Sequence, residues 1–132
     1  MIKKVLFVCV ENSCRSQMAE AFAKIHGKNV LESYSAGSQA SGKINQKAIK
    51  SMQETGYDLG THKSKSLSAI PDIEYDFAIT MGCGDECPYV RAKQRQDWVI
   101  QDPKNMNQQE FNKIRDRIEE KILSLIKNQE LQ

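Results

Sequence analysis

The chain has 132 residues, of which 39% are hydrophobic and 27% charged, a composition typical of one globular domain with a single core. The formal net charge of +2 is too small to favour nucleic acid or an anionic membrane as the main partner. The longest apolar run, residues 5–10, is too short for a membrane span or a signal peptide. We therefore expect a single domain over residues 1–132, monomeric and cytoplasmic, without nucleic-acid or membrane partners.

The first half of the chain alternates two kinds of apolar pattern. Residues 5–9 are continuously apolar and predict a strand buried on both faces, and residues 30–35 predict a second strand. After each strand, apolar residues recur at helical spacing, as do Met18, Phe22 and Ile25 in the first case and Ile44, Ala48, Ile49 and Met52 in the second.

The second half continues this alternation. Residues 75–81 predict a third buried strand and residues 97–101 a short fourth one, in which Trp98 belongs to the core. A long final amphipathic helix is marked by Phe111, Ile114, Ile118, Ile122 and Leu125. The pattern predicts an α/β three-layer sandwich with a four-stranded parallel sheet and helices on both faces. Ligands of such sheets bind beyond the carboxyl ends of the strands, so the loops after the first, third and fourth strands should converge.

The loop after the first strand has the composition of an anion site. It reads C-V-E-N-S-C-R-S, from Cys9 at the strand end to Arg15 and Ser16 at the helix start. The five intervening residues are enough to curl the backbone so that successive N–H groups point inward, beside the positive end of the helix. We therefore expect an oxyanion to be bound by Val10, Glu11, Asn12, Ser13, Cys14 and Arg15.

Cys9 is the candidate nucleophile in the floor of this loop. Helix N-termini and neighbouring cations stabilise a cysteine thiolate, and the Ser16 hydroxyl is placed to hydrogen-bond the sulfur. Arg15 can hold two oxygens of the anion in a bidentate fork. A C-x5-R motif alone is weak evidence, and the alternative is a buried cysteine, a solvated arginine and an ordinary helix cap at Asn12 and Ser13.

Four segments occur in the order found in a known family: VCVENSCRSQMAEAFAK at residues 8–24, YSAG at 34–37, TMGCGDECP at 80–88 and DP at 102–103. Together they resemble, across nearly the whole chain, arsenate reductases built on the low-molecular-weight protein tyrosine phosphatase fold. The resemblance implies that fold and the reduction of arsenate to arsenite, without a cofactor. Hydrolysis of phosphate monoesters by a phosphatase of the same fold is the alternative.

The resemblance also assigns roles to two more cysteines. Arsenate reduction needs two electrons, which two thiols release on forming a disulfide. By similarity, Cys9 attacks arsenate, Cys83 attacks Cys9 to release arsenite and form a Cys9–Cys83 disulfide, and Cys87 converts this to a Cys83–Cys87 disulfide. Gly82 and Gly84 predict a loop that can move towards the anion site. The reductant is thioredoxin, or glutaredoxin with a small thiol, since the C-x3-C spacing is shorter than in the best-known pattern.

The cysteines at positions 9, 14, 83 and 87 also have spacings that a structural zinc site permits. We expect no metal, because a zinc site explains neither Arg15 nor Asp102. Cys14 has no step in the cascade, so we expect an ordinary loop thiol, with a protective disulfide to Cys9 as the alternative.

Asp102 follows the predicted fourth strand. In the family that the chain resembles, this aspartate is the general acid that protonates the leaving oxygen. The alternative is that Asp-Pro is merely a turn. The neighbouring segments DPKNMN and SAGSQASG lack the aromatic residues that hold a phosphotyrosine ring in the phosphatases, which favours the reductase.

Some relatives hold a potassium ion beneath the anion loop with an asparagine, a glutamate, a serine and an acidic residue. Asn12, Glu20 and Ser35 match the first three, and Lys65 occupies the acidic position. We hypothesise that the Lys65 ammonium replaces the ion and braces Glu20 and Asn12. The alternative is an exposed lysine.

Three further side chains are expected at the surface. Relatives commonly have glycine where Glu11 stands, and a carboxylate facing the anion would oppose binding, so its side chain should point to solvent. His26 and His62 lie outside the three loops and are also expected at the surface.

Overall fold

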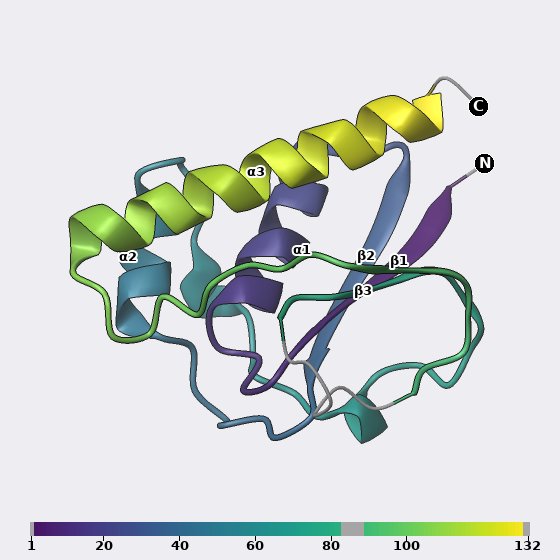
Figure 1. Ribbon diagram of the computed structural model, residues 1–132, viewed down its shortest axis with the longest axis horizontal. Helices are drawn as coiled ribbons and strands as arrows, with labels where there is room; N and C mark the ends of the chain where they lie inside the picture. Colours follow the sequence, from purple (N-terminus) through teal and green to yellow (C-terminus); the bar gives the residue numbers. More distant parts are fainter. Residues whose placement is uncertain (1, 83–88, 131–132) are drawn as a thin grey trace.

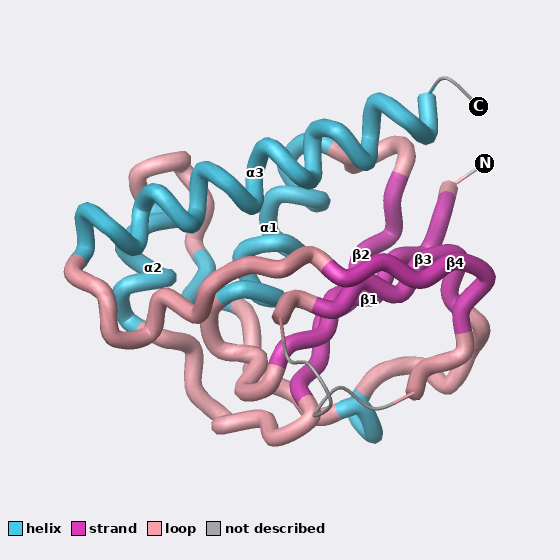
Figure 2. The backbone as a smooth tube through the Cα atoms, in the orientation of Figure 1, coloured by secondary structure: helices cyan, strands magenta, loops and turns pink. Residues whose placement is uncertain are grey.

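A computed structural model describes residues 2–82 and 89–130 of the chain. Its four strands form one sheet in the order β2-β1-β3-β4, and each neighbouring pair is parallel. The strands are β1 (Lys3–Cys9), β2 (Leu31–Gly37), β3 (Tyr75–Thr80) and β4 (Ala92–Asp97). The helices are α1 (Arg15–His26), α2 (Gln46–Gln53) and α3 (Gln108–Glu130), with short 3₁₀ helices η1 (Leu59–Thr61) and η2 (Leu67–Ala69) (Figures 1 and 2).

The sheet is the middle of three layers. On one face, Val5 and Phe7 of β1 belong to the main core with α1 and α3, and the long α3 runs across α1 and α2 (Figure 1). On the other face, Leu6 and Val8 pack with Leu67 of η2 and the residues that flank it. The α/β three-layer sandwich is therefore confirmed, and in the described ranges η2 is the helical part of its second outer layer.

The fourth strand is the one element that the sequence predicted wrongly. The strand is β4 (Ala92–Asp97), and residues 98–101 have already left the sheet. β4 lies at the edge of the sheet and its side chains are mostly exposed, so its sequence AKQRQD has no apolar pattern. Trp98 and Ile100 are only 5% and 2% exposed, so a loop that enters the core resembled a buried strand. Trp98 is a core residue, as predicted.

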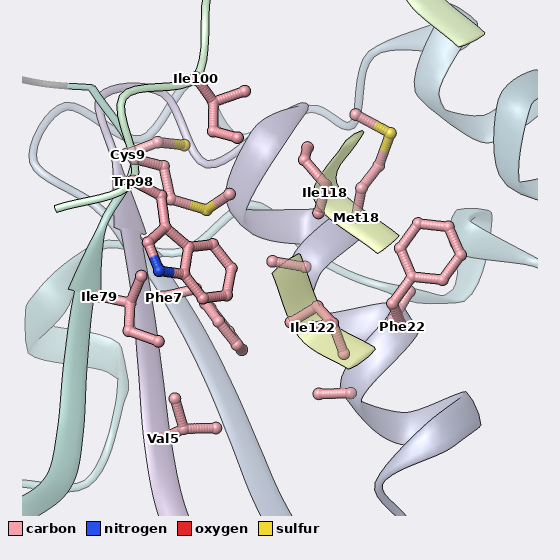
Figure 3. Packing of buried hydrophobic residues seen from close by; sticks show 14 of the residues in the cluster. Val5, Phe7, Cys9, Met18, Phe22, Ile79, Trp98, Ile100, Ile118 and Ile122 are labelled. Atoms are coloured by element: carbon pink, nitrogen blue, oxygen red, sulfur yellow. The ribbon is translucent and has the colours of Figure 1, made fainter. Parts of the chain in front are cut away.

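The buried loop after β4 packs against the carboxyl end of β1 in the core. Figure 3 shows Cys9, at the end of β1, in the same cluster as Ile100 and Trp98. The Trp98 ring lies against Phe7, with 5.8 Å between the ring centroids. The segment from Trp98 to α3 passes the start of α1 (Figure 1), so the first and last predicted loops meet.

The helices that the structure describes do not have the length and composition of membrane spans. Within residues 2–82 and 89–130, none is both long enough and apolar enough to cross a bilayer.

Candidate anion and thiol site

The loop between β1 and α1 turns its carbonyl oxygens outward. Four of them accept hydrogen bonds from N–H groups of the segment after β2: Cys9 from Ser38 (3.1 Å), Val10 from Gln39 (2.8 Å), Glu11 from Ser41 (3.0 Å) and Ser13 from Asn45 (3.1 Å). In the described part of the chain, the N–H groups of residues 11–15 have no acceptor. The start of α1 also lacks a capping side chain. The loop is therefore a set of unpaired donors, as an anion site requires.

Two residues fix the curvature of this loop. Asn12 is fully buried and has a φ of +52°, in the left-handed region. Gly37, at the end of β2, lies directly against the loop. A Cβ atom at Gly37 would be 2.5 Å from the Val10 carbonyl oxygen and 2.9 Å from the Asn12 nitrogen. Only glycine fits there, which explains the last residue of the YSAG segment.

The Cys9 sulfur is hydrogen-bonded to Ser16. Cys9 Sγ lies 2.8 Å from Ser16 Oγ, and Asn12 Nδ2 donates to the same Ser16 oxygen at 2.8 Å. The Lys65 N–H donates to Asn12 Oδ1 at 2.8 Å, which fixes the orientation of the amide. Asn12 therefore positions the Ser16 hydroxyl within hydrogen-bond distance of the Cys9 sulfur, where either atom can be the donor.

The hydrogen-bond chain extends from Asn12 to a histidine. Gln17 Nε2 donates to Asn12 Oδ1 at 2.7 Å and to the Lys63 carbonyl at 2.9 Å, so Gln17 Oε1 is the acceptor for His62 Nδ1 at 2.9 Å. His62 Nε2 then accepts from the Tyr57 hydroxyl at 2.5 Å. Burial lowers the pKa of His62, which keeps the ring in the neutral form that this chain needs.

The prediction that both histidines lie at the surface holds for one of them. His26 is exposed. His62 is half-buried and belongs to the chain just described, so the prediction was wrong there, because only the fold brings residue 62 beside the first loop. Gln17 was missed for the same reason, although its place directly after Arg15 and Ser16 was a usable signal.

Arg15 is buried and joins three segments of the site. Its Nη1 donates to the carbonyls of Met81 (2.6 Å) and Ile100 (3.1 Å), and its Nη2 lies 3.7 Å from Asp102 Oδ2. Gly82 has a φ of +84°, and a Cβ there would lie 3.1 Å from Arg15 Nη1. The guanidinium therefore holds the ends of β3 and of the segment after β4 beside the anion loop. Its predicted bidentate grip on an anion stays a prediction.

The predicted loop after β1 and the predicted loop that holds Asp102 converge on one depression. Cys9, Glu11 and Arg15 line it from one side, and Asp102 and Lys104 from the other. The Asp102 carboxylate is half-exposed and accepts from the Lys104 N–H at 3.1 Å. A proton donor at this position faces the anion loop and solvent together. The role of Asp102 as general acid stays a prediction.

The Glu11 side chain is not simply in solvent. Its Oε2 lies 2.8 Å from Lys104 Nζ, and the side chain is 34% exposed. The carboxylate is thus at the rim of the depression, held by an ion pair. Lys104 was not identified from the sequence, although it follows Asp102 by only two residues.

Cys14 lines the depression but differs chemically from Cys9. Burial raises the pKa of the Cys14 thiol to about 12, and a hydrogen bond from Ser13, 3.7 Å away, offsets only part of this. Cys14 is therefore protonated at neutral pH, in keeping with a thiol that has no catalytic step. Cys9 and Cys14 are both free, so the alternative of a disulfide between them is not present.

The other two cysteines, Cys83 and Cys87, lie outside the described residues. Their roles, the Cys9–Cys83 and Cys83–Cys87 disulfides and the four-cysteine zinc alternative therefore stay predictions. In the ranges 2–82 and 89–130, no three His, Cys, Asp or Glu side chains cluster as metal ligands.

Lys65 lies beneath the anion loop, as the potassium hypothesis requires. Its Nζ is 3.7 Å from Glu20 Oε1, which also accepts from the Ser35 hydroxyl at 2.5 Å. The side chain is 27% exposed, which disfavours the alternative of a freely solvated lysine. Asn12 is braced by the Lys65 N–H rather than by its ammonium.

Comparison with known proteins places this geometry in a family. Residues 4–132 match the family described as low molecular weight phosphotyrosine protein phosphatase. The chain belongs to this family.

Within the low molecular weight phosphatase family, the chain is similar to proteins that carry the name of a reductase. It is 36% identical over 128 residues to the glutaredoxin arsenate reductase of Synechocystis sp., covering 95% of this chain and 97% of that protein. It is 39% identical over 132 residues to the arsenate reductase of Bacillus licheniformis, covering 91% and 92%.

Solved structures of this family superpose on the chain over nearly its whole length. An arsenate reductase in the phosphate binding state gives a TM-score of 0.87 at 35% identity, covering 97% of this chain and 99% of the other. The thioredoxin-dependent arsenate reductase of Corynebacterium glutamicum gives 0.80 at 32% identity, and the match spans 98% of this chain but 63% of that one.

Proposed function

We propose that residues 1–132 form one arsenate reductase domain that reduces arsenate to arsenite through a cascade of cysteine thiols. The observation that carries the proposal is the floor of the site, where a loop of backbone N–H groups without acceptors among the described residues begins at a sulfur that is hydrogen-bonded to Ser16. Such a loop binds a tetrahedral oxyanion and presents a nucleophile to it. The similarity to named arsenate reductases supports arsenate as the substrate.

The first step uses residues that the structure describes. The Cys9 thiolate forms a bond to arsenic, and one arsenate oxygen leaves. Asp102 lies beside Arg15 at the mouth of the depression and supplies a proton, so that the oxygen leaves as water. The backbone donors of residues 10–15, with the Arg15 guanidinium, stabilise the charge on the remaining oxygens.

The second step is the reduction itself. The Cys83 thiolate attacks the Cys9 sulfur, the sulfur–arsenic bond breaks, and its electron pair stays on arsenic, which leaves as arsenite. Two thiols are thereby oxidised to the Cys9–Cys83 disulfide, and arsenate loses one oxygen as water. Cys87 then attacks Cys83, which frees Cys9 and leaves a Cys83–Cys87 disulfide for an external thiol.

We propose thioredoxin as the external reductant, with glutaredoxin and a small thiol as the alternative. Relatives carry both kinds of name, which supports a thiol donor in general. This chemistry needs a reducing compartment, so we place the protein in the cytoplasm. We also propose that it is a monomer. Arsenate-dependent oxidation of NADPH is to be measured with thioredoxin and thioredoxin reductase, and separately with glutathione, glutaredoxin and glutathione reductase. Turnover supported only by the glutaredoxin system would identify glutaredoxin with a small thiol, and not thioredoxin, as the reductant.

The decisive experiment separates the reductase from a phosphatase, the activity in the family's own name. Cys83→Ser should abolish arsenate turnover but retain hydrolysis of p-nitrophenyl phosphate, because only reduction needs a second thiol. Cys9→Ser should abolish both. Absence of arsenate turnover by the wild type with either reductant, together with strong phosphatase activity, would overturn the proposal in favour of the phosphatase.

We also propose that the Lys65 ammonium takes the place of a potassium ion beneath the anion loop. Its contact with Glu20 supports this assignment. Arsenate turnover should then be the same in sodium and in potassium buffers at equal ionic strength. A several-fold stimulation by potassium would contradict it.

A further inference from the structure

An ion pair crosses the mouth of the anion site. Glu11 belongs to the anion loop and Lys104 to the segment after β4, and their charged atoms are 2.8 Å apart although 93 positions separate them in sequence. Both side chains line the same depression as Cys9 and Asp102. The Glu11 and Lys104 side chains are 34% and 51% exposed, so the pair lies at the solvent-facing rim of this depression.

Both ends of the pair are held in place by the backbone. The Glu11 carbonyl accepts from the Ser41 N–H (3.0 Å) and the Ser64 hydroxyl (2.9 Å), so the backbone from which its side chain projects is fixed. The Lys104 N–H donates to Asp102 Oδ1 at 3.1 Å. The hydrogen bond to Glu11 also raises the pKa of Lys104, so its ammonium stays charged.

The position of the pair bears on which oxyanions fit the site. A free oxyanion fits entirely within the anion loop, and no part of it has to extend past the ion pair. A phosphate monoester carries an organic group on the oxygen that Asp102 would protonate, and that group projects towards Asp102 and its neighbour Lys104. The DPKNMN segment offers the group no aromatic side chain to pack against.

We propose that the Glu11–Lys104 ion pair is a specificity element of the anion site, which admits free tetrahedral oxyanions and disfavours organic monoesters. This inference rests on the proposed function and narrows its substrate class. To admit the organic group, the pair must separate, and the carboxylate is then left unneutralised beside the anion. With the pair closed, the Glu11 charge is cancelled and does not oppose a small oxyanion.

The test compares two ligands that differ only by the organic group. Binding of inorganic phosphate and of phenyl phosphate is to be measured by calorimetry in the Cys9→Ser background, where no turnover occurs. Charge changes at the rim affect both anions similarly and so largely cancel in the ratio of their dissociation constants. Loss of the closed pair favours only the ligand with the organic group, so its effect remains in that ratio.

Glu11→Gln and Lys104→Met should therefore both improve the binding of phenyl phosphate relative to inorganic phosphate. We expect about three- to fivefold, the range that an exposed ion pair supplies. The exchange variant, Glu11→Lys with Lys104→Glu, should restore the wild-type ratio. Lys28→Met, an exposed lysine beyond the far end of α1, is the control of equal charge change and should leave the ratio unchanged.

Two results would overturn the inference. One is a ratio that stays constant in both single variants, which would mean that the pair acts only through its charges. The other is a ratio that moves in opposite directions in the two variants. Arsenate turnover does not enter this test, so a failure of the proposed reductase function would be seen separately, in the NADPH assay of the wild type.

Discussion

The two sides of the anion site are built on opposite principles. The floor, formed by Cys9 and residues 12–16 with Gly37 against them, is buried and fixed by hydrogen bonds from several elements. The outer wall, Asp102 and Lys104, is half-exposed and held by ion pairs and one backbone contact. A group that must present a nucleophile and bind charge needs preorganisation, whereas a group that exchanges protons and admits a ligand needs contact with water.

This contrast predicts different outcomes for substitutions on the two sides. Changes in the floor should alter stability, binding and turnover together. Changes in the outer wall should alter turnover or selectivity and leave the free energy of unfolding nearly constant.

The largest effect is expected for Gly37→Ala in the floor. The added Cβ meets the Val10 carbonyl oxygen at 2.5 Å and has to displace the anion loop. We expect a loss of about 2 kcal/mol in the free energy of unfolding, measured in urea, and loss of phosphate binding. Gly42→Ala is the control, since no atom lies within 4 Å of its Cβ and only the φ of +82° opposes it, at about 1 kcal/mol. Unchanged binding in Gly37→Ala would refute the role of Gly37.

Asp102→Asn tests the outer wall. An amide cannot donate the proton that the leaving oxygen needs, so kcat for arsenate should fall about a hundredfold. The free energy of unfolding should change by less than about 0.5 kcal/mol, because the side chain is half-exposed. Asp72→Asn, at a fully exposed carboxylate, is the matched control. A loss of stability as large as that of Gly37→Ala would show that Asp102 supports the fold as the floor residues do, which contradicts its assignment to the outer wall.

Ser16→Ala should have a smaller effect on turnover. It removes the hydroxyl that is hydrogen-bonded to Cys9 Sγ, and kcat/KM for arsenate should fall about tenfold through loss of one hydrogen bond to the attacking sulfur. Ser38→Ala also removes a buried hydroxyl near the loop, one with no hydrogen-bond partner among the described residues, and should leave kcat/KM nearly unchanged. Equal losses in the two variants would argue against a directed bond to the sulfur.

The smallest effect concerns pH and His62. Burial lowers the pKa of His62 below its ordinary value of 6.5; Glu20 and Asp58 oppose this by smaller amounts, and Lys24 and Lys65 add to it. The folded state thus resists protonation, so stability is complete above about pH 6.5 and declines as pH falls through the folded-state pKa. His62→Gln removes this titration. Urea unfolding at pH 7.5, 6.0 and 5.0 should show a shallower decline for the variant, and identical slopes would contradict a neutral buried ring.

The sequence predicted some elements of the fold well and missed others, for identifiable reasons. β1, at the centre of the sheet, is apolar on both faces and was visible as a continuous run. The predicted fourth strand began five residues too late, because an edge strand with exposed side chains has no apolar signature and the buried Trp98 and Ile100 beside it have a strong one. The apolar pattern reports burial but not strand pairing. In β1 the buried residues are also paired in the sheet, whereas at β4 the paired residues are exposed and the buried ones follow the strand.

The sequence by itself, together with the family that it resembles, named the candidate residues of the reaction. The C-x5-R-S loop after a buried strand, the C-x3-C pair and Asp102 are chemical requirements that spacing and residue type can express. Tertiary structure alone decided which residues support them. His62 meets Gln17 across 45 positions, the Lys65 N–H meets Asn12 across 53, and Lys104 meets Glu11 across 93. Such contacts depend on how the strands are ordered in the sheet, and a one-dimensional pattern holds no record of that order.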